Sequence, residues 1–202
     1  MAPKDKVDTP PPVKVDRSTL QKFYNSPQLS DITICFSDRR VRAHKMVLSL
    51  ATPYFQNAFT SGFAESASTE MWLYEDDPDA VHGMLRHFYG LEARGAVTSP
   101  GIYFYLRLFT VASKYDVPTL LDEAVKAVKD ALSDATKASW FPDMVYQIYE
   151  ELPIHQRELR VAVTNACQRN IQELFKTKRF KELLMDVPAF SIDMMQSVLD
   201  DY

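Results

Sequence analysis

Two hydrophobic periods, distributed unevenly along the chain, restrict the possible folds more than any other feature of the sequence. Residues 31–36 alternate apolar and polar side chains, which predicts a strand, and residues 41–43 continue this pattern after a polar turn. One more short strand is predicted at residues 71–74, and every later apolar pattern has the helical period. A regular alternation of strands and helices, typical of parallel sheets, is therefore excluded. The order predicts an α+β fold followed by an all-helical C-terminal extension.

The clearest helix is predicted after Asp77, which can cap its first turn, with Pro78 at the first helical position and Gly90 at its end. Its apolar face is formed by Val81, Met84, Leu85 and Phe88. We expect this face to be buried against helices at residues 102–115 and 118–132. Other helices are predicted at residues 45–51, 53–61, 140–149, 154–175 and 189–199, with one more turn between 176 and 185.

Composition divides the chain into three parts. Residues 1–17 contain four prolines and alternating Lys and Asp, and they have too little apolar surface to offset the entropy of ordering, so we expect a disordered tail. The alternative is that this tail adds a strand to a partner. Residues 18–133 carry the strands and the first helices, and residues 134–202 form the helical extension.

A short helix is predicted at the start of the second part. Ser18-Thr-Leu-Gln21 fits a capping box, in which Ser18 caps the helix and the Gln21 side chain reaches back. Leu20, Phe23 and Tyr24 then form an apolar stripe, but so short a helix is not stable alone. We expect the stripe to pack on its own domain or on a second copy of the chain, in a symmetric homodimer.

Charge and cysteine content narrow the function. With a net charge of −4 and a pI near 5.6, the chain lacks the strongly basic balance of a general nucleic-acid binder. It has no apolar run of about 18 residues and no apolar segment of a secretory signal. Cys35 and Cys167 form no CxxC pair, which excludes a disulfide scaffold. We therefore expect an intracellular protein, in the cytoplasm or the nucleus, with neither nucleic-acid nor membrane partners.

No motif predicts catalysis. The sequence contains no GxSxG, HExxH or Gly-rich phosphate-loop pattern. His82 and His87 lie about 140° apart on a helix of ~3.6 residues per turn, so they cannot clamp one metal ion, and we expect both to face solvent. The acidic run at residues 75–79 is expected to cap the helix that follows it. We expect no enzyme activity, no catalytic residue, no cofactor and no metal.

Four stretches share their order, spacing and residue types with a known family: SPQLSDITI, VRAHKMVLSLATPYFQNAF, GFAESASTEMWLYEDDPDAVHGMLRHFYG and LFTVASKYDVPTLL. Together they resemble the BTB/POZ domain, and in particular the BTB-domain proteins of filamentous fungi. The resemblance covers about residues 26–132 and implies the BTB/POZ fold, a small sheet with a cluster of helices. The helices after residue 139 are similar to the helical hairpins that follow such domains in adaptor proteins.

Individual positions match the family's motifs. His44-Lys45 matches its His-Lys pair, and Phe63 and Glu65 match its Phe-x-Glu-Ser turn. Further matches are Asp31, Tyr54, Phe55, Tyr89, Gly90 and Tyr115.

Each match carries a structural expectation. We expect His44 to tie two backbone groups together by hydrogen bonds. Tyr54, Phe55 and Tyr115 are expected in the core. The acidic residue equivalent to Asp31 lies near the dimer seam in the family, but Asp31 could equally pair with a local Arg or Lys.

The resemblance implies a protein-interaction module without catalysis. Family members form homodimers, assemble transcription regulators, or act as adaptors that dock on a cullin ubiquitin-ligase scaffold. Two functions therefore stay open: an adaptor that docks on a cullin, and a homo-oligomerising regulatory module with no ligase role.

The candidate sites follow from these two functions. Phe63, with Glu65, is the predicted anchor for a protein partner, on a face that includes the helix after Pro78 and the start of the helix after Pro118. The predicted dimer contact consists of Leu20, Phe23, Tyr24 and Asp31. Three departures from the family pattern bear on this: the proline-rich tail replaces an exchanged strand, residues 91–100 lack a hydrophobic-x-Glu motif, and no kelch, MATH or zinc-finger domain is present.

Overall fold

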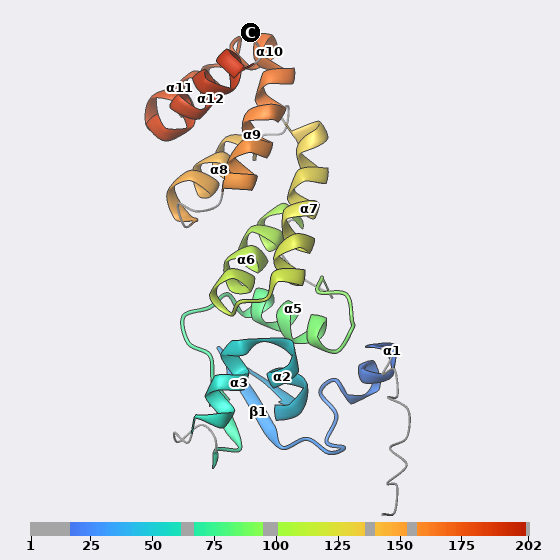
Figure 1. The fold of residues 1–202 in the computed structure, drawn as a ribbon. Helices are drawn as coiled ribbons and strands as arrows, with labels where there is room; N and C mark the ends of the chain where they lie inside the picture. The colour runs from blue at the N-terminus through green and yellow to red at the C-terminus, as the bar shows by residue number, and fades with distance from the viewer. Residues whose placement is uncertain (1–16, 62–66, 95–100, 136–139, 153–156, 201–202) are drawn as a thin grey trace, which may run out of the picture.

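The computed structural model describes residues 17–61, 67–94, 101–135, 140–152 and 157–200. Its elements follow one another along one long direction (Figure 1). The sheet and the first helices form one end, α5, α6 and α7 form the middle, and the last helices form the opposite end. The predicted α+β fold with a helical C-terminal region is confirmed.

The sheet has three strands in the order β2-β1-β3: β1 spans Ile32–Phe36, β2 spans Arg39–Ala43, and β3 spans Glu70–Trp72. β1 and β2 are antiparallel, and β3 pairs with β1 in parallel. β3 begins one residue and ends two residues before the strand predicted at residues 71–74. The turn between β1 and β2 lacks glycine, and Ser37 takes the left-handed conformation there, with φ of 51°. The two strands predicted from alternating patterns therefore belong to one small sheet.

The first helices cover this sheet and continue into the middle of the molecule. Their bounds are α1 Arg17–Leu20, η1 Gln21–Phe23, α2 Lys45–Ala51, α3 Pro53–Thr60, α5 Pro78–Phe88, α6 Gly101–Lys114 and α7 Pro118–Ala135. The capping-box prediction is wrong, because α1 already begins at Arg17 and places Ser18 inside the helix. The Gln21 side chain instead donates a hydrogen bond from Nε2 to the Gly90 carbonyl, at 2.7 Å.

The helix predicted after Asp77 is α5, and it is the centre of the core. Asp77 Oδ1 accepts a hydrogen bond from the Ala80 N–H at 2.9 Å, which caps the helix. Its four predicted apolar residues are buried, and α6 packs against α5, and α7 against α6. Gly83 allows the close approach of α6, because a Cβ there would lie 3.0 Å from the Ala93 carbonyl oxygen and 3.1 Å from the Phe104 ring.

The C-terminal region contains more helices than the sequence predicted. They are α8 Phe141–Tyr146, η2 Gln147–Glu151, α9 Arg157–Arg169, α10 Ile171–Leu174, α11 Lys178–Asp186 and α12 Pro188–Asp200. The pattern predicted as one helix divides at Asn170. Where one turn was predicted, α11 runs for nine residues, because Thr177 caps it and Phe180 and Leu183 are buried. α9 packs against both α7 and α12, which joins this region to the domain before it.

None of the helices within the described ranges has the length and apolar character needed to cross a membrane.

Candidate interaction surfaces

His44 connects three separate parts of the chain. It precedes α2, and only 8% of it is exposed. Its backbone N–H donates to the Tyr89 hydroxyl at 3.0 Å, its Nδ1 lies 2.8 Å from the same hydroxyl, and its Nε2 lies 2.9 Å from the Gln28 carbonyl oxygen. The ring thus joins one backbone group and one side chain, where the sequence analysis expected two backbone groups.

The partners of His44 assign its proton. The Gln28 carbonyl can only accept, so Nε2 carries a hydrogen, and in the neutral imidazole Nδ1 then accepts from the Tyr89 hydroxyl. The same hydroxyl oxygen accepts from the His44 N–H, so the tyrosine is used as both donor and acceptor. Burial raises the pKa of Tyr89 to about 12, so this hydroxyl stays protonated well above neutral pH.

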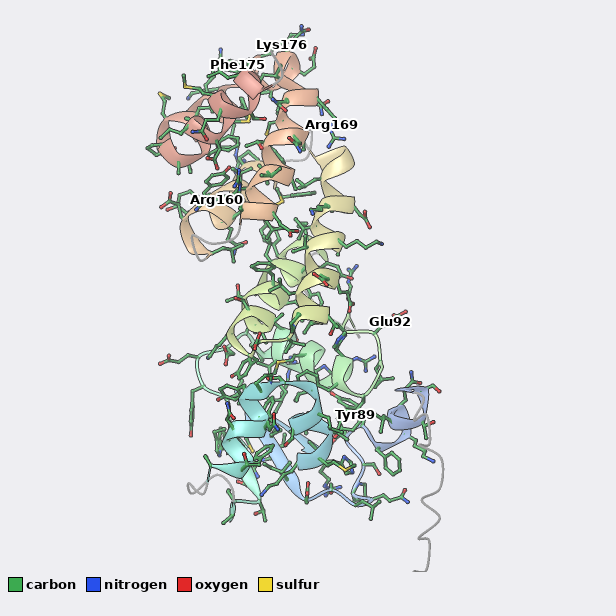
Figure 2. The ribbon with its side chains drawn as sticks, in the orientation of Figure 1. Tyr89, Glu92, Arg160, Arg169, Phe175 and Lys176 are labelled. Atoms are coloured by element: carbon green, nitrogen blue, oxygen red, sulfur yellow. The ribbon has the colours of Figure 1, made fainter. Side chains whose placement is uncertain are left out.

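The N-terminal helix lies against this network (Figure 2). The Phe23 ring contacts the His44 ring edge-on at 5.8 Å, and the Tyr24 ring contacts the Tyr89 ring at 5.6 Å. Leu20, Phe23 and Tyr24 are all partly buried by their own domain. One of the two expected packing partners, the chain's own domain, therefore covers part of the stripe, and contact with a second copy stays a prediction.

Asp31 caps the first turn of α2. Its Oδ1 accepts a hydrogen bond from the Lys45 N–H at 2.8 Å. Among the described residues, Asp31 binds a backbone group and forms no ion pair with an Arg or Lys side chain. Its place in a dimer contact stays a prediction. The Asp31 side chain remains exposed, beside the start of β1.

The aromatic residues expected in the core behave differently from one another. Phe55 and Tyr115 are fully buried and stacked, with ring centroids 6.0 Å apart, and the Tyr115 hydroxyl donates to Asp76 at 2.6 Å. Tyr54 contacts the Tyr115 ring at 4.7 Å but is 39% exposed, so its placement in the core is wrong. Thr52 completes the cluster, because its hydroxyl donates to the Tyr115 carbonyl and accepts from the Tyr54 N–H.

The acidic residues at 75–79, where α5 begins, bind several different partners. Asp77 caps α5, Asp76 also binds the Lys114 ammonium at 2.8 Å, and Asp79 binds Arg39 at 2.8 Å. Within the described ranges, no group of three or more His, Cys, Asp or Glu side chains is placed to hold a metal ion.

The two histidines of α5 were expected to face solvent, but both are partly buried against other elements. His87 lies between α5 and α7, with Nε2 2.9 Å from the Thr119 hydroxyl and Nδ1 3.3 Å from the Glu123 carboxylate. His82 lies against the Tyr24 ring, and burial, followed by the nearby Arg86, lowers its pKa. The end of α5 and the start of α7 are thereby held together as one surface. Phe63 and Glu65, the predicted anchor for a protein partner, lie outside the described residues.

Two exposed apolar residues on α2 were missed by the sequence analysis. Met46 is 70% exposed and Leu50 is 82% exposed, one turn apart, whereas Val47 and Leu48 are buried. Both side chains lie on α2, which begins directly after His44. The sequence did contain an indication of this surface. When a short surface helix has apolar residues on both faces, its own domain covers only one of them.

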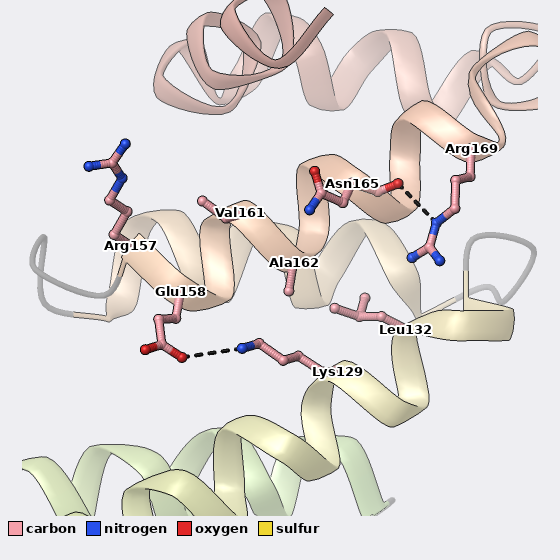
Figure 3. A pocket seen from close by; sticks show the side chains of 8 residues that line it. All are labelled: Lys129, Leu132, Arg157, Glu158, Val161, Ala162, Asn165 and Arg169. Carbon is pink, nitrogen blue, oxygen red and sulfur yellow. Dashed lines mark hydrogen bonds and ion pairs between the residues drawn. The ribbon is translucent and has the colours of Figure 1, made fainter. Parts of the chain in front are cut away.

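A groove of about 450 Å³ lies between α7 and α9 (Figure 3). Leu132 and Ala162 face each other across it, and the Lys129 ammonium binds the Glu158 carboxylate at 3.2 Å at one end. The basic residues that line it are Lys129, Arg157 and Arg169. Lys129 is paired with Glu158, and Arg169 donates a hydrogen bond to the Asn165 carbonyl.

A second groove, of about 480 Å³, lies among the last three helices. It is lined by Ile171, Phe175, Phe180, Leu184, Ser191, Met194, Met195, Val198 and Leu199. Figure 2 shows Phe175 at the end of the molecule opposite Tyr89. The sequence analysis did not predict this surface, because it treated the apolar residues of α12 only as one face of an amphipathic helix.

Comparison with known proteins gives a family and several relatives. The family model of the BTB/POZ domain matches residues 20–132. Kelch repeat and BTB domain-containing protein 1 of cowpox virus is 25% identical over 187 residues, which cover 92% of this chain and 31% of the viral protein. A BTB/POZ domain-containing protein of Arabidopsis thaliana is 31% identical over 127 residues, or 62% of this chain and 16% of that protein.

Other relatives come from zebrafish. Kelch repeat and BTB domain-containing protein 8 of Danio rerio is 30% identical over 108 residues, covering 53% of this chain and 17% of that protein. The solved BTB domain of zebrafish PATZ1 matches with a TM-score of 0.43 and 18% identity, over 56% of this chain and 91% of that domain. The chain spans about a third or less of the length of the curated relatives named here.

Proposed function

Because the chain belongs to the BTB/POZ domain family, we propose that it is an adaptor that docks on a cullin-type ubiquitin-ligase scaffold. BTB domains are typically protein-interaction modules without catalysis. What supports the adaptor function is the continuous packing from α5 through α6 and α7 to α9. The match to the cowpox relative, which has kelch repeats, covers 92% of the chain and so extends past residue 132 into these last helices.

The docking face that we propose joins the end of α5 and the start of α7. His87 holds these two ends together through Thr119 and Glu123, so the surface is preformed rather than assembled on binding. Phe63 and Glu65, which precede β3 in the sequence, are the anchor and the polar neighbour that we propose. A large apolar group among polar residues is the usual centre of such a contact.

Calorimetry against a cullin N-terminal domain tests the proposal. The wild type should bind, and Phe63→Ala should weaken binding by at least ~2 kcal/mol while the fold is retained. Phe175→Ala is the matched control, since it removes a half-exposed ring at the opposite end of the molecule and should leave cullin binding unchanged. A wild type that gives neither heat nor complex at tens of micromolar contradicts the adaptor function.

The exposed apolar side chains of α2 favour a second function, a homo-oligomerising regulatory or transcription-associated module with no ligase role. Met46 and Leu50 are exposed on α2, Leu20 and Phe23 are only partly buried, and Asp31 accepts a hydrogen bond from the first residue of α2. A symmetric contact between two copies would cover these side chains. The two functions are compatible, because the dimer face and the proposed docking face use different residues.

Sedimentation distinguishes the dimer from the monomer. Met46→Asp with Leu50→Asp changes only exposed side chains, so it should keep the fold and convert a dimer to a monomer. Leu20→Ser with Phe23→Ser should act in the same direction. A wild type that is already monomeric at high concentration contradicts the dimer.

Both functions place the protein inside the cell, in the cytoplasm or the nucleus. Its assignment to the BTB proteins of filamentous fungi stays a prediction.

A further inference from the structure

The groove among α10, α11 and α12 is an apolar surface at the end of the molecule farthest from the sheet (Figure 1). None of the nine residues that line it carries a charge, and only Ser191 is polar. Its side chains come from three successive helices, of which α11 packs on α12 while α10 and α12 both pack on α9, so the groove is part of the folded C-terminal region.

α12 is apolar on two sides. On one side of the helix, Phe190 and Met194 are buried. Ile192, Met195 and Leu199, spaced so that they form one ridge, are 56%, 67% and 70% exposed. A helix with apolar residues on both sides is normally covered on both. The exposed ridge therefore needs a partner surface, which the described part of this chain does not supply.

The exposed area is sufficient for a dimer. At roughly 200 Å² for a fully exposed side chain of this size, the exposed fractions of the three ridge residues, Phe175 and Val198 amount to about 560 Å² of apolar surface. A standard interface takes about 800 Å² from each partner, and about 65% of it, or ~520 Å², is apolar in homodimers. The two methionines of the lining can adjust their shape to an incoming side chain.

The chemistry of the groove selects the occupant. An uncharged lining offers no ion pair to a charged peptide, so the occupant must present a ridge of apolar side chains along a helix. α12 presents such a ridge, and two of its three residues, Met195 and Leu199, also line the groove. Two copies related by a two-fold axis can then pack this face of α12 against the same face of the other copy, which is the self-complementarity that a symmetric contact requires.

We infer that the groove among α10, α11 and α12 is a self-association surface that takes the α12 ridge of a second copy of this chain. This contact is separate from the one proposed for α2 and the N-terminal helix, and it does not depend on cullin docking. It leaves the α5 and α7 face open, because that face lies nearer the sheet.

Sedimentation equilibrium tests the inference in the Met46→Asp, Leu50→Asp background, which removes the other proposed contact. This protein should still associate, and adding Met195→Asp with Leu199→Asp should weaken the association at least about thirtyfold. Met185→Asp is the matched control, since Met185 is 71% exposed on α11 but does not line the groove. It should leave the association unchanged.

Cysteine cross-linking gives a second measurement that needs no charged substitution. Met195→Cys should be joined between copies by a bismaleimide reagent, whereas Met185→Cys should not, and the natural Cys35 and Cys167 are fully buried. A background protein that stays monomeric overturns the inference, whatever other protein the groove then captures. It is also overturned if Met185→Asp weakens association as much as the paired groove variant does.

Discussion

Replacing Tyr89 with phenylalanine removes one hydroxyl that two groups of His44 depend on. The His44 N–H loses its acceptor at 3.0 Å, and the imidazole Nδ1 loses its donor at 2.8 Å. Both groups belong to a residue that is only 8% exposed, so water replaces the hydroxyl poorly. Each unsatisfied buried group costs about 1–3 kcal/mol.

We therefore expect Tyr89→Phe to lower the free energy of unfolding by about 3 kcal/mol. For a chain of this length, that corresponds to a fall in Tm of roughly 6–12 °C. Urea unfolding followed by circular dichroism measures the change, and an unaltered m-value would show that the midpoint shift reports stability.

Tyr24→Phe is the matched control, because its ring lies 5.6 Å from the Tyr89 ring. The Tyr24 hydroxyl is also buried, but it has no hydrogen-bond partner among the described residues. Removing it should change stability by less than about 0.5 kcal/mol, or increase it slightly. Burial raises the pKa of both tyrosines to about 12, so neither variant removes a charge at pH 7. Equal losses in the two variants would refute the role assigned to the Tyr89 hydroxyl.

Three further substitutions or reactions test other parts of the structure. Phe88→Ala should cost about 3–5 kcal/mol in urea unfolding, as expected for a buried ring of α5, and an unchanged Tm would contradict its placement. Burial, with the Arg86 charge, lowers the pKa of His82 in the folded state, so the wild type should lose stability as pH falls below about 6.5. His82→Asn should lose less over the same range, and parallel pH profiles would contradict this. Burial raises the pKa of Cys167 to about 12 and Cys35 is equally inaccessible, so an aromatic disulfide reagent at pH 8 should label neither thiol before unfolding. Rapid labelling of the native protein would show that one of them is open.

The sequence predicted those elements whose signals are local and agree with each other. For α5, the Asp77 cap, the proline after it and the apolar spacing all indicate the same helix, and the structure contains it. The paired strands were predictable for the same reason, because Ile34 and Val41 are each part of an alternating pattern. The order of these elements, together with the family's motifs, was enough to predict the fold.

Interactions between distant residues account for the errors. Gln21 satisfies a carbonyl at Gly90 rather than its own helix, and no local pattern indicates that acceptor. His82 and His87 have polar side chains on a helix that also packs near the N-terminal segment and α7, so their burial depends on elements far away in sequence. The surface of α12 was missed because periodicity shows which residues share a face, but not whether another element covers that face.

The length of α7 sets how the two ends of the molecule can act on each other. Its 18 residues extend about 27 Å at 1.5 Å per residue, with α6 packed against it on one side and α9 on another. It thus works as a rigid arm, and whatever is bound at the C-terminal end is presented to the sheet end at a fixed distance and angle. An inserted residue in the middle of this arm would rotate one end relative to the other by about 100° while lengthening it by only about 1.5 Å. For the adaptor function proposed above, such an insertion is expected to keep the binding surfaces at both ends and to change only their mutual orientation.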